Sequence, residues 1–315
     1  HQNPSDWNLS QSTKFRVLKW NRDNLSAREI RILENLANDH RFRDGYWTLT
    51  IERLFALSKI FEESDQPILH IESDVLLLPN FPVENFEYEK PPFVWGAARD
   101  NEDIAAIFFV SSKNQMMKFI ESAFSLLEIN PKHTDMSLLH EIRRQGTLDV
   151  RIWPFPSDHK ESNPHLNLRL RYINSEGFFD VAPLGMWLTG VDPRNNYGFL
   201  VSRDYDYLKQ IGYYASFAQN APFKFDYKGH LWINETPIYC LHIHSKQIEL
   251  FSQNWQESLN QFVERSQKFG AKIEGFNLKL FLSLYYQNVR NHTFLRYTQS
   301  FIKWLIQRAG VRFRD

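Results

Sequence analysis

Two acidic side chains interrupt an apolar segment at residues 68–78, Ile-Leu-His-Ile-Glu-Ser-Asp-Val-Leu-Leu-Leu. The apolar residues predict a buried strand, in which ionised Glu72 and Asp74 are costly without a compensating cation or hydrogen-bond donors. Side chains two positions apart in an extended strand point to the same face, so both carboxylates can converge on one ion. The pair therefore predicts a site for a hard divalent ion that carries phosphate oxygens, outside the carboxyl end of a strand. The alternative is a polar strand end at which Asp74 only caps the next element.

A second group of polar side chains lies in the segment Leu-His-Ile-His-Ser-Lys at 241–246. His242, His244 and Lys246 share one face of an extended segment. One imidazole can complete the ligand set of the ion, and the Lys246 ammonium can neutralise a phosphate. A mixed oxygen and nitrogen ligand set favours Mn²⁺, with Mg²⁺ as the alternative. The competing interpretation is an edge strand whose polar face carries the two imidazoles.

Three further positions are candidates for contact with a substrate. Asp135 follows Thr134 at a predicted helix start, where either residue can cap the helix and Asp135 can instead serve catalysis or sugar binding. Asp180 and Gly190 lie within residues 178–195, whose glycines and prolines indicate backbone that approaches itself or a ligand closely. We take Asp135 and Asp180 as candidate catalytic carboxylates and Gly190 as a candidate cofactor-binding position.

The elements that would position these groups follow from the spacing of apolar residues. A helix over 47–61 leads through Gln66-Pro67 into the 68–78 strand, which is half of a βαβ unit. The remaining predictions are strands over 14–20, 93–98 and 105–111, helices over 26–38, 114–128, 136–145, 256–268 and 278–308, a surface loop over 154–170 and a hairpin over 230–244.

The bulk composition limits the classes of protein and of partner. With 43% hydrophobic and 23% charged residues, the chain matches an ordinary soluble globular protein. The formal net charge is zero, which predicts no nucleic-acid partner. Cys240 is the only cysteine, which excludes an intrachain disulfide and any metal site built from several cysteines. Because the chain begins with His rather than Met, we expect further sequence, such as a strand or an anchor, to precede it.

Three short motifs occur in an order that resembles the GT-A glycosyltransferases: the helix leading into Ile-Leu-His-Ile-Glu-Ser-Asp, then Thr-Asp-Met-Ser-Leu-Leu at 134–139, then Leu-His-Ile-His-Ser-Lys. In this resemblance Glu72-Ser73-Asp74 is a variant of the Asp-x-Asp motif of the family, with Glu in place of the first Asp. The resemblance implies an α/β fold with a Rossmann-like mixed central sheet flanked by helices. It implies a catalytic domain over 1–250, whose first strand is expected upstream of His1, and a C-terminal helical extension over 251–315.

The resemblance also implies a reaction, the transfer of a sugar from a nucleotide-diphosphate donor to a saccharide or glycan acceptor, with uridine as the favoured base. Asp74 would bind the metal ion together with His242 or His244. Glu72 would contact the ribose, or the metal through a water, and Lys246 would meet the diphosphate. If the reaction inverts the anomeric centre, Asp135, or Asp180 as the second candidate, would deprotonate the acceptor hydroxyl.

Two other classes of protein stay open. A metal-dependent hydrolase or nucleotidyltransferase would use the same carboxylates and imidazoles on a nucleotide sugar or phosphoester without an acceptor. An inactive glycan-binding module is the third class, and the aromatic fraction of 15% is its support.

The basic and aromatic residues of 278–308 either contact a membrane surface or form the solvated side of a packed helix. The expected location is the cytoplasm or the membrane surface of a bacterium, with a secretory-pathway lumen as the alternative.

Overall fold

The computed structural model describes residues 20–37, 45–63, 65–82, 91–99, 101–154, 171–185, 199–202, 223–226, 228–233, 235–243, 257 and 272–276. In these segments the chain is a mixed α/β protein with mixed sheets flanked by helices. The helical elements are a short 3-10 helix η2 (Arg22–Asn24) and the α-helices α1 (Ala27–Asn35), α2 (Tyr46–Glu63), α4 (Lys113–Ile129) and α5 (Asp135–Gln145).

The strands are β1 (Ile68–Ile71), β2 (Val75–Leu77), β3 (Phe93–Arg99), β4 (Glu102–Val110), β5 (Val150–Ile152), β6 (Phe178–Phe179), β7 (Phe199–Ser202), β8 (Phe223–Phe225), β9 (Leu231–Ile233), β10 (Thr236–His242) and β11 (Lys272–Phe276). The first sheet has the order β1-β4-β3-β5, in which β3 and β5 are parallel and the other pairs antiparallel. The second sheet has the antiparallel order β2-β10-β9-β8, with β6 parallel to β10. β7 and β11 form a separate antiparallel pair.

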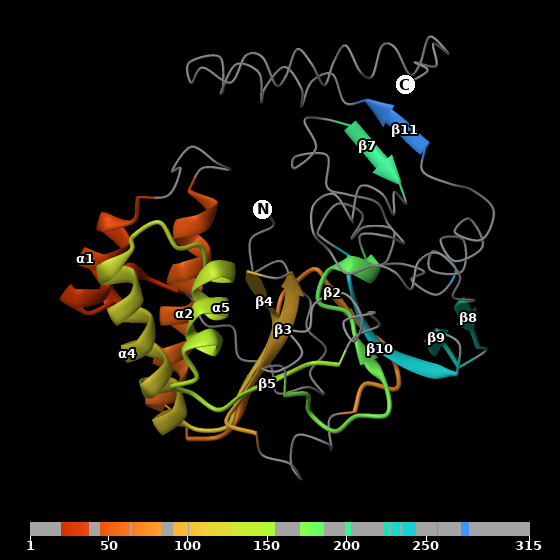
Figure 1. Ribbon diagram of the computed structural model, residues 1–315, viewed down its shortest axis with the longest axis horizontal. Coiled ribbons are helices and arrows are strands. Elements are labelled where there is room, and N and C mark those ends of the chain that lie inside the picture. Colours follow the sequence, from red (N-terminus) through yellow and green to blue (C-terminus); the bar gives the residue numbers. More distant parts are fainter. Residues whose placement is uncertain are drawn as a thin grey trace, which may run out of the picture.

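The first sheet separates two layers of the molecule. In Figure 1 the four α-helices lie together on one side of β3 and β4, and β2 and β10 of the second sheet lie on the other side. The core is divided in the same way, because Phe108 and Val110 of β4 pack with the helices whereas Ile107 and Phe109 pack with the second sheet. A strand that is buried on both faces needs an unbroken apolar run, and the sequence supplies one at 104–110.

The predicted single strand over 68–78 is wrong, because the chain changes sheets in the middle of this segment. β1 pairs with β4 in the first sheet, and β2 pairs with β10 in the second. Between them the Val75 N–H donates to the Glu72 carbonyl at 3.1 Å and closes a turn. β1 is also half-buried along its length rather than fully buried. Glu72, Ser73 and Asp74 therefore form a polar junction between two sheets and do not continue a strand.

Helix α5 is fixed at both of its ends. Thr134 caps the N-terminus and Ser137 completes the capping box, so that Asp135 is the first helical residue and not the cap. Near the other end, Arg143 makes two hydrogen bonds to the buried carboxylate of Asp103 in β4, at 2.6 and 2.7 Å. The anchored helix brings the Asp135 side chain to the edge of the sheet junction.

The other predicted elements that fall on described residues are present with small shifts of their ends. These are the helices over 26–38, 47–61, 114–128 and 136–145, the strands over 93–98 and 105–111, and the hairpin over 230–244 as far as residue 243. The 14–20 strand apart from Trp20, most of the 154–170 loop and the 278–308 helix lie outside the described residues, as does the 256–268 helix apart from Glu257. The predicted helical extension over 251–315 contributes strand β11, which the sequence did not predict. No helix in the described segments is both long and apolar enough to cross a lipid bilayer.

Candidate metal centre

The turn that carries Glu72 and Asp74 is held from both sheets. The Glu72 N–H donates to the Ala106 carbonyl of β4 at 2.9 Å, which fixes the end of the turn next to the first sheet. The Ile243 N–H donates to the Asp74 carbonyl at 2.8 Å, which fixes the other end next to β10. The two carboxylates thus occupy defined positions although neither belongs to a strand.

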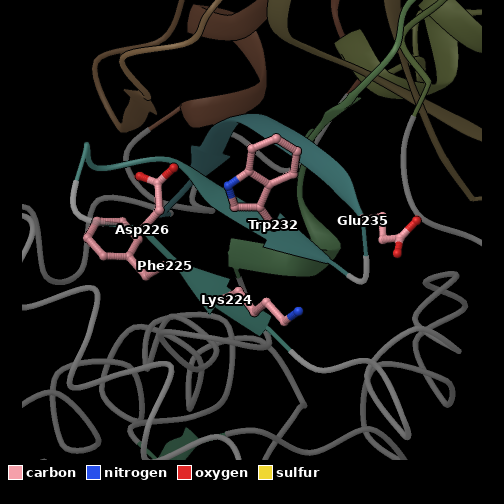
Figure 2. Close-up of a pocket in the computed structure, with 5 residues that line it drawn as sticks. All are labelled: Lys224, Phe225, Asp226, Trp232 and Glu235. Atoms are coloured by element: carbon pink, nitrogen blue, oxygen red, sulfur yellow. The ribbon is translucent and has the colours of Figure 1, made fainter.

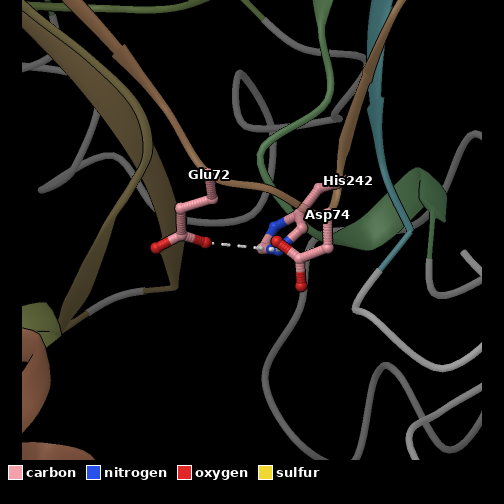
Figure 3. A group of neighbouring side chains, drawn as sticks. All are labelled: Glu72, Asp74 and His242. Carbon is pink, nitrogen blue, oxygen red and sulfur yellow. Dashed lines mark ion pairs between the residues drawn. The ribbon is translucent and has the colours of Figure 1, made fainter. Parts of the chain in front are cut away.

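His242 completes a group of three side chains at this turn (Figure 3). Its Nε2 atom lies 3.4 Å from Oδ1 of Asp74 and 3.5 Å from Oε2 of Glu72. One ligand atom from each residue lies within 4.8 Å of the others, so that the three can hold one metal ion. The structure therefore brings together residues that are more than 160 positions apart in the sequence, as the residue types predicted.

The orientation of the His242 ring suits a metal ligand. Its Nδ1 atom lies 2.6 Å from the Val181 carbonyl, and this acceptor requires the proton to be on Nδ1. A ligating histidine usually donates its second N–H to a carbonyl or carboxylate in the same manner, which fixes the ring and leaves Nε2 for the ion. In octahedral coordination with bonds of about 2.1 Å, neighbouring ligand atoms are about 3 Å apart. The distances from Nε2 of His242 to Oδ1 of Asp74 and to Oε2 of Glu72 are close to this value.

Without an ion, His242 is positively charged at neutral pH. Burial alone would lower the pKa of the ring, which is only 6% exposed, but the carboxylates of Asp74 and Glu72 outweigh burial and raise the pKa to about 9. A proton on Nε2 and a metal ion would occupy the same place between the carboxylates. Metal binding is therefore coupled to release of this proton.

Asp180 organises the backbone around His242. One of its oxygens accepts the N–H groups of Ala182 and Leu184, and the other accepts those of Gly185 and His242, at 2.7–3.1 Å. A Cβ atom on Gly185 would collide with the His242 backbone, so the residue must be glycine for the two segments to meet. Of the two possibilities predicted for residues 178–195, close approach to other backbone or to a ligand, the structure shows the first at Gly185.

These contacts give Asp180 a structural role. Both oxygens are engaged and the side chain is buried, so that no lone pair faces a substrate. Burial raises the pKa of Asp180 above its ordinary value, and the amide donors of His242, Gly185 and Leu184 oppose that rise. The geometry favours Asp180 as the residue that positions His242 over the catalytic role considered from the sequence.

Arg53 joins the metal centre to Asp135. From helix α2, its Nη1 donates to Oε1 of Glu72 and its Nη2 donates to Oδ2 of Asp135 at 3.0 Å. The residue types and spacing do not predict a role for Arg53 at this site. The available signal was a single cation inside the buried stretch of α2, between Ile51 and Leu54.

Asp135 is buried beside this guanidinium. Its side chain is 7% exposed, and no hydrogen-bond partner reaches its Oδ1 from the described part of the chain. Burial raises the pKa of Asp135 above its ordinary value, and the Arg53 charge opposes this rise. His70 lies near the same guanidinium, and burial together with the Arg53 charge lowers the pKa of its ring to about 4, so that it is neutral at physiological pH.

The remaining predicted site residues, His244, Lys246 and Gly190, lie outside the described residues. Of the two candidate histidines, His242 is the one that the structure places at the carboxylates. His244 stays a prediction, as do the roles of Lys246 and Gly190.

A separate hollow of about 590 Å³ lies on the β8–β9 hairpin, lined by Lys224, Phe225, Asp226, Trp232 and Glu235 (Figure 2). Trp232 pairs in register with Pro237, five residues before His242. At about 3.4 Å per residue along a strand, the backbone of Pro237 is about 17 Å from that of His242, and none of the metal ligands lines the hollow. It is therefore distinct from the candidate metal centre.

No family model matches the sequence, and no curated protein or solved structure matches the chain significantly. The function must accordingly be inferred from the site itself.

Proposed function

We propose that the chain is a metal-dependent glycosyltransferase of the GT-A type, which transfers a sugar from a nucleotide-diphosphate donor to a saccharide or glycan acceptor. The observation that carries this proposal is the orientation of His242, whose Nδ1 is held by the Val181 carbonyl while Nε2 faces Asp74 and Glu72. The motifs that resemble the family supply the reaction class, and a UDP-sugar is the favoured donor.

The residues at the sheet junction fit a divalent ion. Asp74 and His242 would hold it, and Glu72 would face it with the oxygen that Arg53 does not engage. Two oxygen donors and one nitrogen donor favour Mn²⁺, with Mg²⁺ as the alternative. When bound, the ion supplies Lewis-acid stabilisation of the negative charge on the departing diphosphate.

Asp135 is proposed to meet a sugar hydroxyl. A buried carboxylate oxygen without a donor is costly, and a hydroxyl group of the donor or the acceptor would supply the missing hydrogen bond to Oδ1. The raised pKa also makes Asp135 a better base than an exposed aspartate, which suits removal of a proton from an acceptor hydroxyl in an inverting reaction. Asp180 is not assigned to this step because both of its oxygens are occupied by backbone amides.

The first experiment measures thermal stability of the chain with UDP, GDP and CMP sugars, with and without Mn²⁺. We expect one nucleotide class to raise the melting temperature only when Mn²⁺ is present, since a ligand at 100 times its Kd stabilises by about 2.7 kcal/mol. Asp74→Asn should abolish this shift. Asp65→Asn is the matched control, because Asp65 is an exposed carboxylate before the opposite end of β1. An equal shift in Asp74→Asn, or no metal-dependent shift with any nucleotide sugar, would reject the proposal.

A second measurement distinguishes transfer from hydrolysis. Release of the nucleoside diphosphate from the preferred donor is followed with and without saccharide acceptors. Release that depends on an acceptor supports a glycosyltransferase. Equal release without any acceptor identifies the hydrolase instead, and binding without release identifies the inactive module.

A further inference from the structure

Arg53 is positioned to affect the metal centre without contacting the ion. Its guanidinium bridges one oxygen of Glu72 and one oxygen of Asp135, and the three side chains come from α2, from the β1–β2 turn and from the first residue of α5. The side chain of Arg53 is 23% exposed, and that of Asp135 is 7% exposed. Solvent therefore screens this bridge less than an ion pair on an open surface.

The bridge divides the two oxygens of Glu72 between different partners. Oε1 accepts from Arg53, and Oε2 lies 3.5 Å from Nε2 of His242. With Oε1 engaged by Arg53, Oε2 is the oxygen of Glu72 that faces the ion site, so that chelation through both oxygens is disfavoured while the bridge is in place. The positive charge of Arg53 also reduces the negative potential that attracts a cation to this place.

We infer that Arg53 is a positioning residue of the metal centre, which holds Oε1 of Glu72 away from the ion and thereby limits the affinity of the centre for a divalent cation. The inference rests on the proposed function, since it takes Glu72, Asp74 and His242 as the metal site. Arg53 and the ion compete for the charge of one carboxylate. An affinity limited in this way suits an ion that must also bind and release a diphosphate.

If Arg53 limits the affinity of the centre, removing it should tighten Mn²⁺ binding, whereas a variant that damages the fold should weaken it. Without the guanidinium, both oxygens of Glu72 become available and the local charge becomes one unit more negative. The affinity of calcium sites also rises with the number of charged ligands. Arg53→Met should therefore bind Mn²⁺ at least about tenfold more tightly than the wild-type chain, a difference of ~1.4 kcal/mol. A merely structural role would weaken Mn²⁺ binding together with thermal stability.

The test is calorimetric titration of the full chain with Mn²⁺ alone at pH 8. Arg53→Lys keeps the charge, so its Kd should stay within about threefold of the wild-type value, if charge sets most of the effect. Arg22→Met is the matched control, because Arg22 forms an ion pair with Glu52, the neighbour of Arg53 in α2. Its Mn²⁺ affinity should equal that of the wild-type chain.

The outcomes separate this inference from the proposed function. Wild-type protein that binds no Mn²⁺ overturns both. Wild-type protein that binds Mn²⁺, with equal or weaker binding by Arg53→Met, overturns the role of Arg53 alone. If Arg53→Met does not unfold cooperatively, Arg53→Gln removes the charge but keeps hydrogen-bond donors, and the same tightening is expected. Failure of both variants to fold assigns Arg53 to the stability of the fold and overturns the inference.

Discussion

The buried ion pair between Arg143 of α5 and Asp103 of β4 is predicted to be a main source of stability for the helical layer that carries Asp135. Asp103 is fully buried, and Arg143 donates to both of its oxygens at 2.6 and 2.7 Å. Trp95 donates its indole N–H to the same carboxylate at 2.7 Å. Burial would raise the pKa of Asp103, but the hydrogen bonds and charge of Arg143 lower it below the usual range. The carboxylate is therefore ionised and depends on Arg143.

Arg143→Met should cost about 3–5 kcal/mol of the free energy of unfolding, because it leaves an ionised carboxylate buried without its partner. This loss is a large part of the ~5–15 kcal/mol that stabilises a typical domain. Adding Asp103→Asn to Arg143→Met should recover part of the loss, since the double variant buries no unpaired charge.

Arg144 provides a matched control on the same helix. It pairs with Glu141 one turn away, and its side chain is 57% exposed. Water screens such exposed pairs, so Arg144→Met should change the free energy of unfolding far less than Arg143→Met does. Urea denaturation followed by tryptophan fluorescence and circular dichroism measures all of the variants. Equal losses in Arg143→Met and Arg144→Met would refute the reasoning.

The same pair predicts a dependence on pH. Because the pKa of Asp103 is lowered in the folded state, its contribution is fully present above the unfolded value near 3.8 and is lost as the pH falls through the folded value. In Arg143→Met the carboxylate of Asp103 keeps Trp95 and His140 beside it but loses the guanidinium, so protonation on acidification should relieve part of the loss. The difference between wild type and variant should thus shrink from pH 7 towards pH 3.

Two further predictions concern the metal centre. Gly185→Ala places a Cβ atom against the backbone of His242, so we expect a lower melting temperature and weaker Mn²⁺ binding. Thermal melting and calorimetric titration measure the two effects. Unchanged values of both would contradict the close approach of Gly185 to His242. Because a proton on His242 must leave before the ion binds, the affinity for Mn²⁺ should rise about tenfold from pH 7 to pH 8 and level off above about pH 9. Calorimetry in buffers of different ionisation enthalpy would detect the released proton, and equal Kd values at the two pH values would count against Nε2 as a ligand.

The sequence predicts those helices and strands whose buried faces appear as a regular spacing, or an unbroken run, of apolar residues. The run at 104–110 is apolar at every position because β4 is covered on both faces, and α4 repeats apolar residues at helical spacing. The segment 68–78 has apolar residues at both ends as well, but these belong to different sheets. Hydrophobicity reports burial and not the partner strand, so the change of sheet could not be read from this pattern.

The candidate site was predictable to the extent that residue type determines chemistry. The residue types predict that Glu72 and Asp74 converge with His242 or His244, because carboxylates and an imidazole are ligands for one kind of ion, but they do not predict which histidine. The role of Asp180 was not predictable, since it depends on backbone amides that any residue type would supply. The role of Arg53 was hidden for a related reason, because an arginine in a helix is usually a solvated residue and only tertiary contacts place it between two carboxylates.

The charges at the sheet junction connect these observations. Glu72, Asp74 and Asp135 carry three negative charges when all are ionised, and Arg53 compensates one of them. The proton that His242 holds, with its pKa raised to about 9 by Asp74 and Glu72, compensates a second negative charge, which leaves the ion-free centre with a single negative charge. Replacing that proton with a divalent ion makes the centre neutral. The high pKa of His242 and the proposed affinity for a metal ion thus have one origin, an excess of carboxylates over fixed cations at this partly buried junction. If removing Arg53 increases that excess, it should strengthen the attraction for both the proton and the ion.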